Sequence, residues 1–417
     1  MSNLHKVGKV ISSTLKGITP KYVDHSSVIV LNQKCIRNNV IDWSFAQHHD
    51  PEKKFSESKI VRVGDILINS TGQGTAGRCA FVKDLPADCV VVVDSHILIV
   101  RVDNFYTAGC LGYSLFSIEN ILQSFLGGST GQGEFDKQRL FNIITGLPVS
   151  EKQKATYDIL NCLDKKIELN NQINTELEAM AETIHDYWFV QFDFPDANGQ
   201  PYKTSGGKMI YSKIIKRDIP EGWTVKKLSE ITTLIKRGIS PKYVETGGIS
   251  VLNQKCVRDQ RVSFNDSRRH GVVLKESDER LLRKLDVVIN STGVGTLGRV
   301  AFVKRLNEEK TTVDSHVSIV RFDHEQISAE YLAWAMLRFQ PVIEAAAKGS
   351  TGQVELSKTF LENIDVIVPD DNLQKSFEKF TCPIIQDIAS KEQEIETLVD
   401  LREWLLPMLM NGQVTVK

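Results

Sequence analysis

The stretch INSTGQGTAGRCAFVK at residues 68–83 recurs as INSTGVGTLGRVAFVK at residues 289–304, with thirteen of sixteen positions identical. Upstream of it, residues 17–37 (GITPKYVDHSSVIVLNQKCIR) and 238–258 (GISPKYVETGGISVLNQKCVR) agree at thirteen of twenty-one positions. The copies are 221 residues apart, a period far too long for a solenoid repeat. The chain is therefore predicted to be a tandem duplication of one large unit.

Each repeat is predicted to be a mixed domain followed by a long helix. Short apolar runs such as DILINS and VVVVDSHILIVRV, separated by Gly-rich turns, are typical of strands, and helices are expected at 107–126 and 328–347. The fold class is therefore α/β in the mixed α+β sense. The predicted boundaries are a first lobe at 1–149, a central helix at 150–190, a linker at 191–221, a second lobe at 222–369, a C-terminal helix at 370–410 and a tail at 411–417.

The two long helices show start signals and an apolar seam. Ser150 with Gln153, and Asp371 with Gln374, have capping-box spacing after a proline. Apolar residues then recur mostly three and four positions apart, with Asn170 as a polar interruption in the first helix and a break in the apolar seam near Pro383 in the second. We expect the helices to pair as an antiparallel coiled coil; the alternative is that each packs only on its own lobe.

Charge is segregated along the chain, although the formal net charge is only −1. Residues 231–305 carry fifteen Lys and Arg against seven Asp and Glu, and residues 10–84 carry ten against seven. Residues 150–190 and 371–404 each carry four basic and eight acidic residues. This pattern favours basic lobes that face phosphate and acidic helices that do not.

Cysteine usage and hydropathy narrow the class of protein. The seven cysteines form no CxxC pair, which argues against a zinc site and a disulfide framework and fits a reducing compartment. No apolar stretch reaches the ~18 residues that a membrane span needs, and the first fifteen residues lack the apolar core of a secretory signal. We therefore expect a cytoplasmic protein without a membrane partner.

A dinucleotide-binding fingerprint is present twice, at 72–77 and at 293–298, with Asp94 and Asp314 about twenty residues downstream. That site requires a helix directly after the glycines, because the helix N-terminus holds the pyrophosphate. Here β-rich segments follow, so we interpret each motif as a strand–loop–strand turn. No P-loop, HExxH or GxSxG motif appears, and His96 and His316 in the repeated VDSH are interpreted as structural.

The candidate DNA-binding residues are polar and basic side chains at matching positions in the two repeats. Amides suit the adenine edge, and Lys and Arg suit guanine or phosphate. The alternative is that the repeated VLNQKC is a plain strand that reflects only shared ancestry. The set is Asn32, Gln33, Lys34, Arg37, Thr71, Gln73 and Arg78 in the first repeat, and Asn253, Gln254, Lys255, Arg258, Thr292 and Arg299 in the second.

The duplicated lobes, their helices and the linker WFVQFDFPDANGQPYKTSGGKM (188–209) running into IPEGW resemble specificity subunits of type I restriction-modification systems. The resemblance implies two target-recognition domains at 1–149 and 222–369, each reading one half of a split double-stranded DNA target, with a pseudo-twofold arrangement. It implies two methyltransferase subunits and restriction subunits as partners. S-adenosylmethionine, ATP and Mg would bind those partners, so that this chain itself would have no cofactor, no metal and no catalytic residue.

Two features qualify this interpretation. The first repeat lacks the lead-in IPEGWTVKKL (219–228), so the tail LLPMLMNGQVTV (405–416) is expected to complete its edge and make the molecule nearly cyclic. Two other functions stay open: a non-catalytic scaffold for another macromolecule, and the target-recognition part of a methyltransferase-nuclease. The second alternative needs a catalytic half, and the duplication accounts for the whole chain.

Overall fold

The computed structural model describes residues 3–72, 74–127, 134–272, 274–348 and 355–414. The chain divides into two compact units: unit 1 is Met1–Leu169 with Ile395–Lys417, and unit 2 is Asn170–Glu394. Each unit therefore contains one lobe and a portion of each long helix. The unit boundaries fall within the helices, whereas the sequence places domain boundaries at their ends.

The two lobes contain nearly the same succession of elements, with α1 of lobe 1 replaced in lobe 2 by the 3-10 helix η5 (Leu228–Glu230). In lobe 1 these are β1 (Asn3–Lys6), α1 (Val7–Val10), β2 (Ser13–Lys16), β3 (Tyr22–Val23), β4 (Val28–Leu31), the 3-10 helix η1 (Gln33–Cys35), β5 (Ile36–Arg37), β6 (Val40–Ile41), β7 (Gln47–His49), β8 (Ile66–Asn69), β9 (Cys79–Phe81), β10 (Val90–Val93), β11 (Ile97–Arg101), α2 (Phe105–Ser117), α3 (Glu119–Gln123), α4 (Lys137–Asn142) and β14 (Ile144–Leu147). In lobe 2 they are β17 (Thr224–Lys227), β18 (Thr232–Arg237), β19 (Tyr243–Val244), β20 (Ile249–Leu252), η6 (Gln254–Cys256), β21 (Val257–Arg258), β22 (Arg261–Val262), β23 (Arg268–His270), β24 (Val287–Asn290), β25 (Val300–Phe302), β26 (Thr311–Val313), β27 (Val317–Phe322), α6 (Ala329–Arg338), α7 (Gln340–Lys348), α8 (Lys358–Glu362) and β28 (Asp365–Val368).

Sheet topology is also duplicated. Lobe 1 has one four-stranded sheet in the order β2-β11-β8-β9 and another in the order β10-β4-β7-β3. Lobe 2 has β18-β27-β24-β25 and β26-β20-β23-β19, which are the corresponding strands in the same order. The mixed fold with two homologous lobes, each followed by a long helix, is therefore confirmed.

The central strands are buried on both faces, which explains why they are continuous apolar runs without alternation. In lobe 1, Ile66 and Ile68 pack in the core beneath α2, whereas Leu67 between them packs toward the second sheet. In lobe 2, Val287 and Ile289 face α6, and Val288 faces the other way. The sheet containing β8 or β24 is thus the middle of three layers, with a helix on one side and the second sheet on the other.

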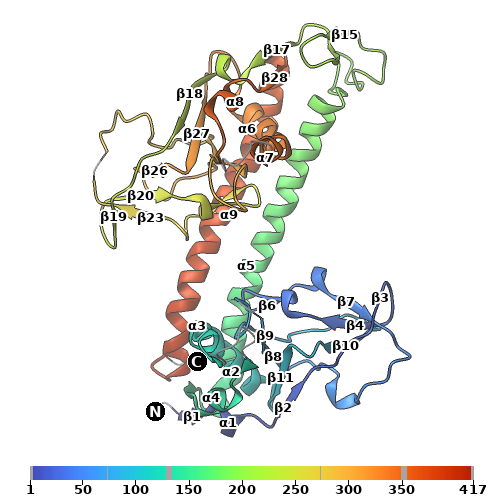
Figure 1. Ribbon diagram of the computed structural model, residues 1–417, viewed down its shortest axis with the longest axis vertical. Helices are drawn as coiled ribbons and strands as arrows, with labels where there is room; N and C mark the ends of the chain where they lie inside the picture. Colours follow the sequence, from blue (N-terminus) through green and yellow to red (C-terminus); the bar gives the residue numbers. More distant parts are fainter. Residues whose placement is uncertain (1–2, 73, 128–133, 273, 349–354, 415–417) are drawn as a thin grey trace. The chain divides into compact units, whose positions relative to one another are not determined.

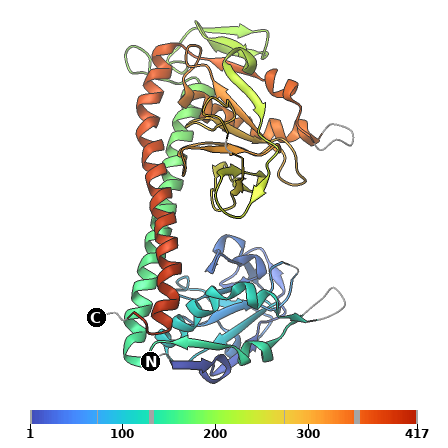
Figure 2. The ribbon, with the colours of Figure 1, turned by 90° about the vertical axis from the view of Figure 1, so that its left-hand side faces the viewer.

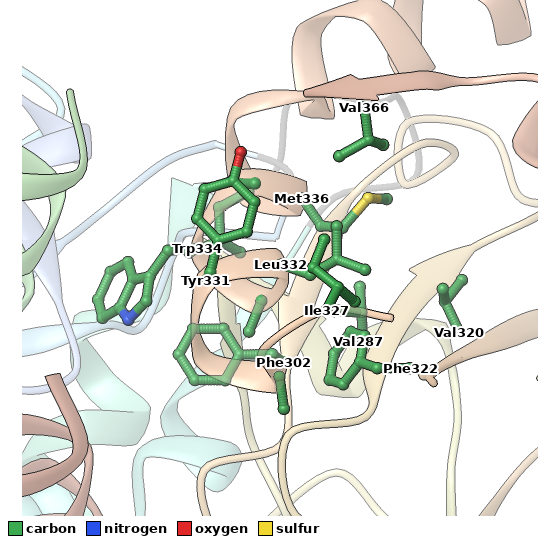
Figure 3. Packing of buried hydrophobic residues seen from close by; sticks show 14 of the residues in the cluster. Val287, Phe302, Val320, Phe322, Ile327, Tyr331, Leu332, Trp334, Met336 and Val366 are labelled. Atoms are coloured by element: carbon green, nitrogen blue, oxygen red, sulfur yellow. The ribbon is translucent and has the colours of Figure 1, made fainter. Parts of the chain in front are cut away.

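Figure 3 shows the helix side of this sandwich in lobe 2. Leu332 and Met336 of α6 lie toward Val287 and Val320 of the sheet, and Val366 of β28 lies beside them. Trp334 is 2% exposed and its ring lies 5.4 Å from that of Phe302. These buried side chains fix α6 on the sheet that contains β24, and one of the loops described below begins at the end of β24.

Helices α5 (Ser150–His185) and α9 (Asp371–Met410) run side by side within each unit (Figure 1). In unit 2, Asn170 Nδ2 donates to Glu394 Oε2 at 2.8 Å, and the His185 and Phe377 rings are 5.8 Å apart. Residue numbers rise along α5 in the direction in which they fall along α9, so the two helices pair in antiparallel orientation (Figure 2). Asn170 is fully buried, and its bond to Glu394 accounts for the polar interruption in the seam.

The starts of the long helices differ from the expected capping boxes. Gln153 Nε2 donates to Pro148 O at 3.1 Å, and Gln374 Nε2 donates to Pro369 O at 2.8 Å. Each Gln also receives a hydrogen bond from its own lobe, at Oε1, from Thr107 Oγ1 and from the backbone N of Ser328. The glutamines therefore tie each helix start to the lobe before it. In the second helix the cap is Asp370, which accepts from the backbone N of Leu373.

One expectation about helix continuity is wrong and another is confirmed. The helices expected at 107–126 and 328–347 are each two helices, α2 with α3 and α6 with α7. The helix predicted at 370–410 is α9, which is continuous from Asp371 to Met410 although its apolar seam is interrupted near Pro383. A proline inside a helix removes one hydrogen bond, and the packing of neighbouring Ile384 and Ile385 in the core compensates for it.

The first lobe has a lead-in strand after all. Strand β1 pairs antiparallel with β14, as β17 pairs with β28 in the second lobe. The chain end contributes instead through α9: Leu406, Leu409 and Met410 pack in the same core as Val7 and Leu147. Both ends of the chain thus belong to unit 1, which is the nearly cyclic arrangement. In the part of the chain that the structure describes, no helix is long and apolar enough to span a membrane.

Candidate nucleic-acid interface

Each lobe contains a hydrogen-bonded chain of glutamine, threonine and histidine, here called the Gln–Thr–His chain. In lobe 1, Gln33 Nε2 donates to Thr71 Oγ1 at 2.7 Å, and Thr71 Oγ1 lies 2.7 Å from His96 Nδ1. In lobe 2, the same bonds join Gln254 Nε2 to Thr292 Oγ1 at 3.1 Å, and Thr292 Oγ1 to His316 Nδ1 at 2.6 Å. The sequence predicted Gln and Thr as a site but not their link to His.

Three loops bring these residues together because of strand direction. Strands β4 and β10 are parallel, as are β20 and β26, so the loops that leave their carboxyl ends meet at one sheet edge. Gln33 follows β4, His96 follows β10, and Thr71 follows the end of β8. Asn69 Nδ2 donates to Gln33 O at 3.1 Å and joins the first loop to the third.

The histidines are the exposed members of the chain. Thr71 Oγ1 accepts from Gln33, so its own hydrogen is available for Nδ1 of His96; the neutral imidazole would then carry its proton on Nε2. The backbone N of His96 donates to Asp94 Oδ1 at 2.9 Å, and that of His316 to Asp314 Oδ1 at 2.9 Å. The interpretation of these histidines as merely structural overlooked this position. The repeated VDSH was the available signal.

Asn32 and Asn253 are positioned as caps. The side-chain oxygen of each accepts from the backbone N of the lysine two residues on, and so begins η1 or η6. The amide nitrogen of Asn32 donates to Phe45 O at 2.8 Å, and that of Asn253 to Asp266 O at 2.7 Å. These bonds fix the loop that presents the neighbouring lysine, so the geometry assigns the asparagines a supporting position beside the surface.

The Gly-rich segments are hairpin loops, as predicted. Strand β8 pairs antiparallel with β9, and β24 with β25. Gly72 has φ +102°, and a Cβ there would lie 2.6 Å from Gln33 Oε1, so glycine permits the close approach of the glutamine side chain. Arg78 donates to Gly74 O at 2.9 Å, and Arg299 to Gly295 O at 3.0 Å, which closes each loop on itself. Gln73 and the GSTGQ segments at 128–132 and 349–353 lie outside the described residues.

Four exposed cations, two in each lobe, follow the glutamine of the Gln–Thr–His chain in the sequence. Lys34 and Lys255 are the exposed residues of η1 and η6, and Arg37 and Arg258 are exposed at the ends of β5 and β21. Arg258 lies 3.4 Å from Asp259, and both side chains are at least half exposed, so this pair is weak. Lysine and arginine here can neutralise phosphate without breaking a buried interaction.

Burial raises the pKa of carboxyl and thiol groups beneath this surface. It raises the pKa of Asp94 and of Asp314 above the usual range, and the hydrogen bond from the following histidine backbone opposes it. Burial also raises the pKa of Cys35 and of Cys256 to about 11. These thiols accept from the backbone N of Asn32 and Asn253, so they hold the loop and are poor nucleophiles.

One further pair of exposed residues lies at this surface, outside the candidate set and within the stretches 38–62 and 259–283 where the two repeats diverge. Gln47 and Arg268 are exposed at the start of β7 and β23. Asn32 Nδ2 lies 3.4 Å from Gln47 Oε1, and the Arg268 guanidinium lies 3.5 Å from the centroid of the Tyr243 ring. Within the described residues, no group of three His, Cys, Asp or Glu side chains could hold a metal ion.

Comparison with known proteins gives the same result for both repeats. Residues 16–179 and 220–399 match the family model of the type I restriction modification DNA specificity domain. The chain is 24% identical over 415 residues to the type I restriction enzyme HindI specificity subunit of Haemophilus influenzae, covering 85% of this chain and 88% of that protein. It is 25% identical over 315 residues to the type I restriction enzyme MjaIX specificity subunit of Methanocaldococcus jannaschii, covering 73% and 69%.

A solved structure shows the same fold. The type I restriction-modification system S subunit from M. genitalium aligns with a TM-score of 0.57 and 14% sequence identity. The alignment covers 98% of this chain and 96% of that subunit. The likeness therefore extends over both lobes and both long helices.

Proposed function

The chain belongs to the type I restriction-modification DNA specificity family, and on this premise we propose that each lobe reads its half of a bipartite target through the surface around its Gln–Thr–His chain. The chain is the DNA sequence-recognition subunit of such a system. The observation that carries the proposal is that the same bonded, partly exposed side chains occur at matching positions in both lobes. Two equal reading surfaces suit a target with two halves.

The chemistry of this surface divides into two parts. Exposed lysine and arginine supply affinity by neutralising phosphate, and side chains with paired donors and acceptors supply sequence discrimination. Four exposed cations that are close to the Gln–Thr–His chain in the sequence fit the first part: Lys34, Arg37, Lys255 and Arg258. The amide and imidazole groups fit the second part, because the hydrogen bonds within the chain hold them in one orientation.

We assign methylation and cleavage to partner subunits. The two matched segments account for most of the chain and both are specificity domains, which supports a recognition role for all of it. Two methyltransferase subunits would supply S-adenosylmethionine binding and adenine chemistry, and restriction subunits would use ATP and Mg. Calorimetry on the purified chain should show no binding of S-adenosylmethionine. Stoichiometric binding would contradict the assignment and revive the nucleotide interpretation of the GxGxxG loops.

The direct test replaces Lys255 and Arg258 together by Ala. Affinity of the assembled methyltransferase for cognate duplex should fall by ~1–3 kcal/mol if either residue reads a base, with a smaller loss on random duplex. A pure phosphate role predicts equal losses on both duplexes. The matched control is Lys375→Ala with Lys379→Ala on the acidic helix α9, where both lysines are exposed. Equal affinity of the test variant and the native protein on every duplex would exclude this surface.

A further inference from the structure

Strands β7 and β23 lie in a stretch where the two repeats have different sequences. Gln47 pairs with Val30 of β4, and Arg268 pairs with Val251 of β20. Val30 and Val251 are themselves equivalent in the duplication, so Gln47 and Arg268 occupy one structural position in two lobes. Both side chains are exposed.

Each of these two residues touches the shared polar surface of its lobe. Gln47 Oε1 lies 3.4 Å from the amide of Asn32, the cap that precedes Gln33. Arg268 stacks on Tyr243, whose hydroxyl lies 3.4 Å from Asp314 Oδ2, and Asp314 in turn holds the backbone of His316. A guanidinium stacked on a ring has its planar set of donors oriented before any ligand arrives.

The neighbouring side chains on the same strands are engaged within the lobe. His49 and His270 are buried and accept at Nδ1 from the backbone N of Lys21 and Lys242. Arg269 donates to the carbonyls of two glycines and to Glu308. Arg268, by contrast, has no hydrogen-bond or ion-pair partner within the described residues. Of the side chains on β23, only that of Arg268 has its donors available.

We infer that Gln47 and Arg268 are equivalent base-reading residues, and that the half-site of lobe 1 carries adenine where that of lobe 2 carries guanine. Glutamine forms a bidentate contact with N6 and N7 of adenine, whereas arginine forms one with O6 and N7 of guanine. The inference rests on the proposed function and deepens it. It makes the two half-sites similar, because the Gln–Thr–His chain is shared, and different at one base pair, because this position is not.

The test exchanges the two side chains and reads the methylated motif. A host strain lacking the native gene would express the native chain, Arg268→Gln or Gln47→Arg with its partner subunits, and methylated adenines would be mapped across its genome. Arg268→Gln should shift one base pair of one half-site from guanine toward adenine, and Gln47→Arg should shift the other half-site from adenine toward guanine. Roughly tenfold discrimination at that base pair is expected in each case.

The controls separate this inference from the proposed function. Arg283→Gln removes the same charge from an exposed residue that precedes the start of β24, whereas the Gln–Thr–His chain lies beyond its end, and it should leave the motif unchanged. Native-like motifs in both exchange variants would refute the inference and leave the proposed function intact. Absence of any motif with the native chain would refute the proposed function itself. If Arg268→Gln does not accumulate in soluble form, Gln47→Arg decides, and loss of methylation without a new motif also counts against the inference.

Discussion

Lobe 1 and lobe 2 share a buried ion pair and the Gln–Thr–His chain, but they differ at the exposed starts of β7 and β23. The buried Arg101–Asp65 pair of lobe 1 returns as Arg321–Asp286 in lobe 2, and the Gln–Thr–His chain returns with the same bonded atoms. At the starts of β7 and β23, however, lobe 1 has an amide where lobe 2 has a stacked guanidinium.

With such a difference, one fold can recognise two DNA sequences. The bonded residues hold the loops at the sheet edge, and a change in any of them leaves a partner unsatisfied. An exposed residue at the edge of this surface can be replaced without leaving a buried hydrogen-bond partner unsatisfied. The shared residues thus account for the loop geometry and for the bases common to both half-sites, and the base that differs between the half-sites depends on the side chains that differ.

The largest expected effect removes the buried ion pair of one lobe. Arg321 donates to Asp286 at 2.9 and 2.6 Å, and burial raises the pKa of Asp286 despite this partner. Asp286→Ala should destabilise unit 2 by ~3–5 kcal/mol, because it leaves a buried charge unpaired. Asp65→Ala should cost less, since Arg101 is more exposed than Arg321 (13% against 8%). Urea unfolding, combined with hydrogen exchange resolved for each lobe, measures the loss of stability in both variants. A larger loss in Asp65→Ala than in Asp286→Ala would contradict this prediction.

The next effect interrupts the Gln–Thr–His chain. Thr71→Val and Thr292→Val keep the side-chain shape but remove the hydroxyl between amide and imidazole. Each should weaken binding of the assembled methyltransferase to cognate DNA by ~1–2 kcal/mol. Similar losses are expected because the chains are equivalent. Thr183→Val on α5, where the exposed threonine bonds only to its own helix, is the control and should have no effect. A loss in one variant alone would show that only one chain contributes to binding.

The two lobes make different ion pairs with helix α5, and the ion pair of lobe 1 should make the stability of unit 1 depend on pH. Burial acts to raise the pKa of Asp164, but Lys83 nearby and hydrogen bonds from Tyr113 and Arg402 outweigh it, so the pKa is lowered. A lowered folded-state pKa adds stability above the unfolded pKa, and this is lost as the pH falls through the folded value.

Asp164→Asn should therefore destabilise unit 1 at pH 7, and the difference should disappear as the pH falls below the ordinary aspartate pKa of about 4 and through the lowered folded-state value. Urea titrations of native and variant chains at a series of pH values measure this. In unit 2, Lys304 pairs at 3.0 Å with Glu178 of α5 instead. Hydrogen exchange in unit 2 should be unchanged in Asp164→Asn. A stability difference that persists at pH 2 would contradict the electrostatic explanation.

The smallest effect concerns the hairpin loops. Gly74 and Gly295 both have φ +78°, and a Cβ at either would meet nothing within 4 Å. Alanine at either position should cost about 1 kcal/mol of unfolding free energy through backbone strain alone, and equally in both lobes. Thermal denaturation measures the cost, and the methylated motif should stay the same. A changed motif would mean that these loops read DNA.

The sequence was sufficient for features that repeat or that have a period. Identity at a fixed offset predicted the duplication, and the β-rich residues after Gly77 and Gly298 predicted hairpins in place of a nucleotide site. Contacts between distant residues were not predictable in this way. Thr71 meets His96 across 25 residues, and Arg268 meets Tyr243 across 25 residues. Likewise, Gln153 and Gln374 fit a local capping rule, but contacts with their lobes assign them another role.

The most direct test of the account is a genome-wide map of methylated adenines in the host with and without this gene. We expect one bipartite motif whose methylation depends on the gene. Its half-sites should be related to each other in inverted orientation and should differ at a base pair that is adenine in one and guanine in the other. Two unrelated half-sites would contradict it, because they would show that the residues shared by the two lobes support the fold and do not read the target.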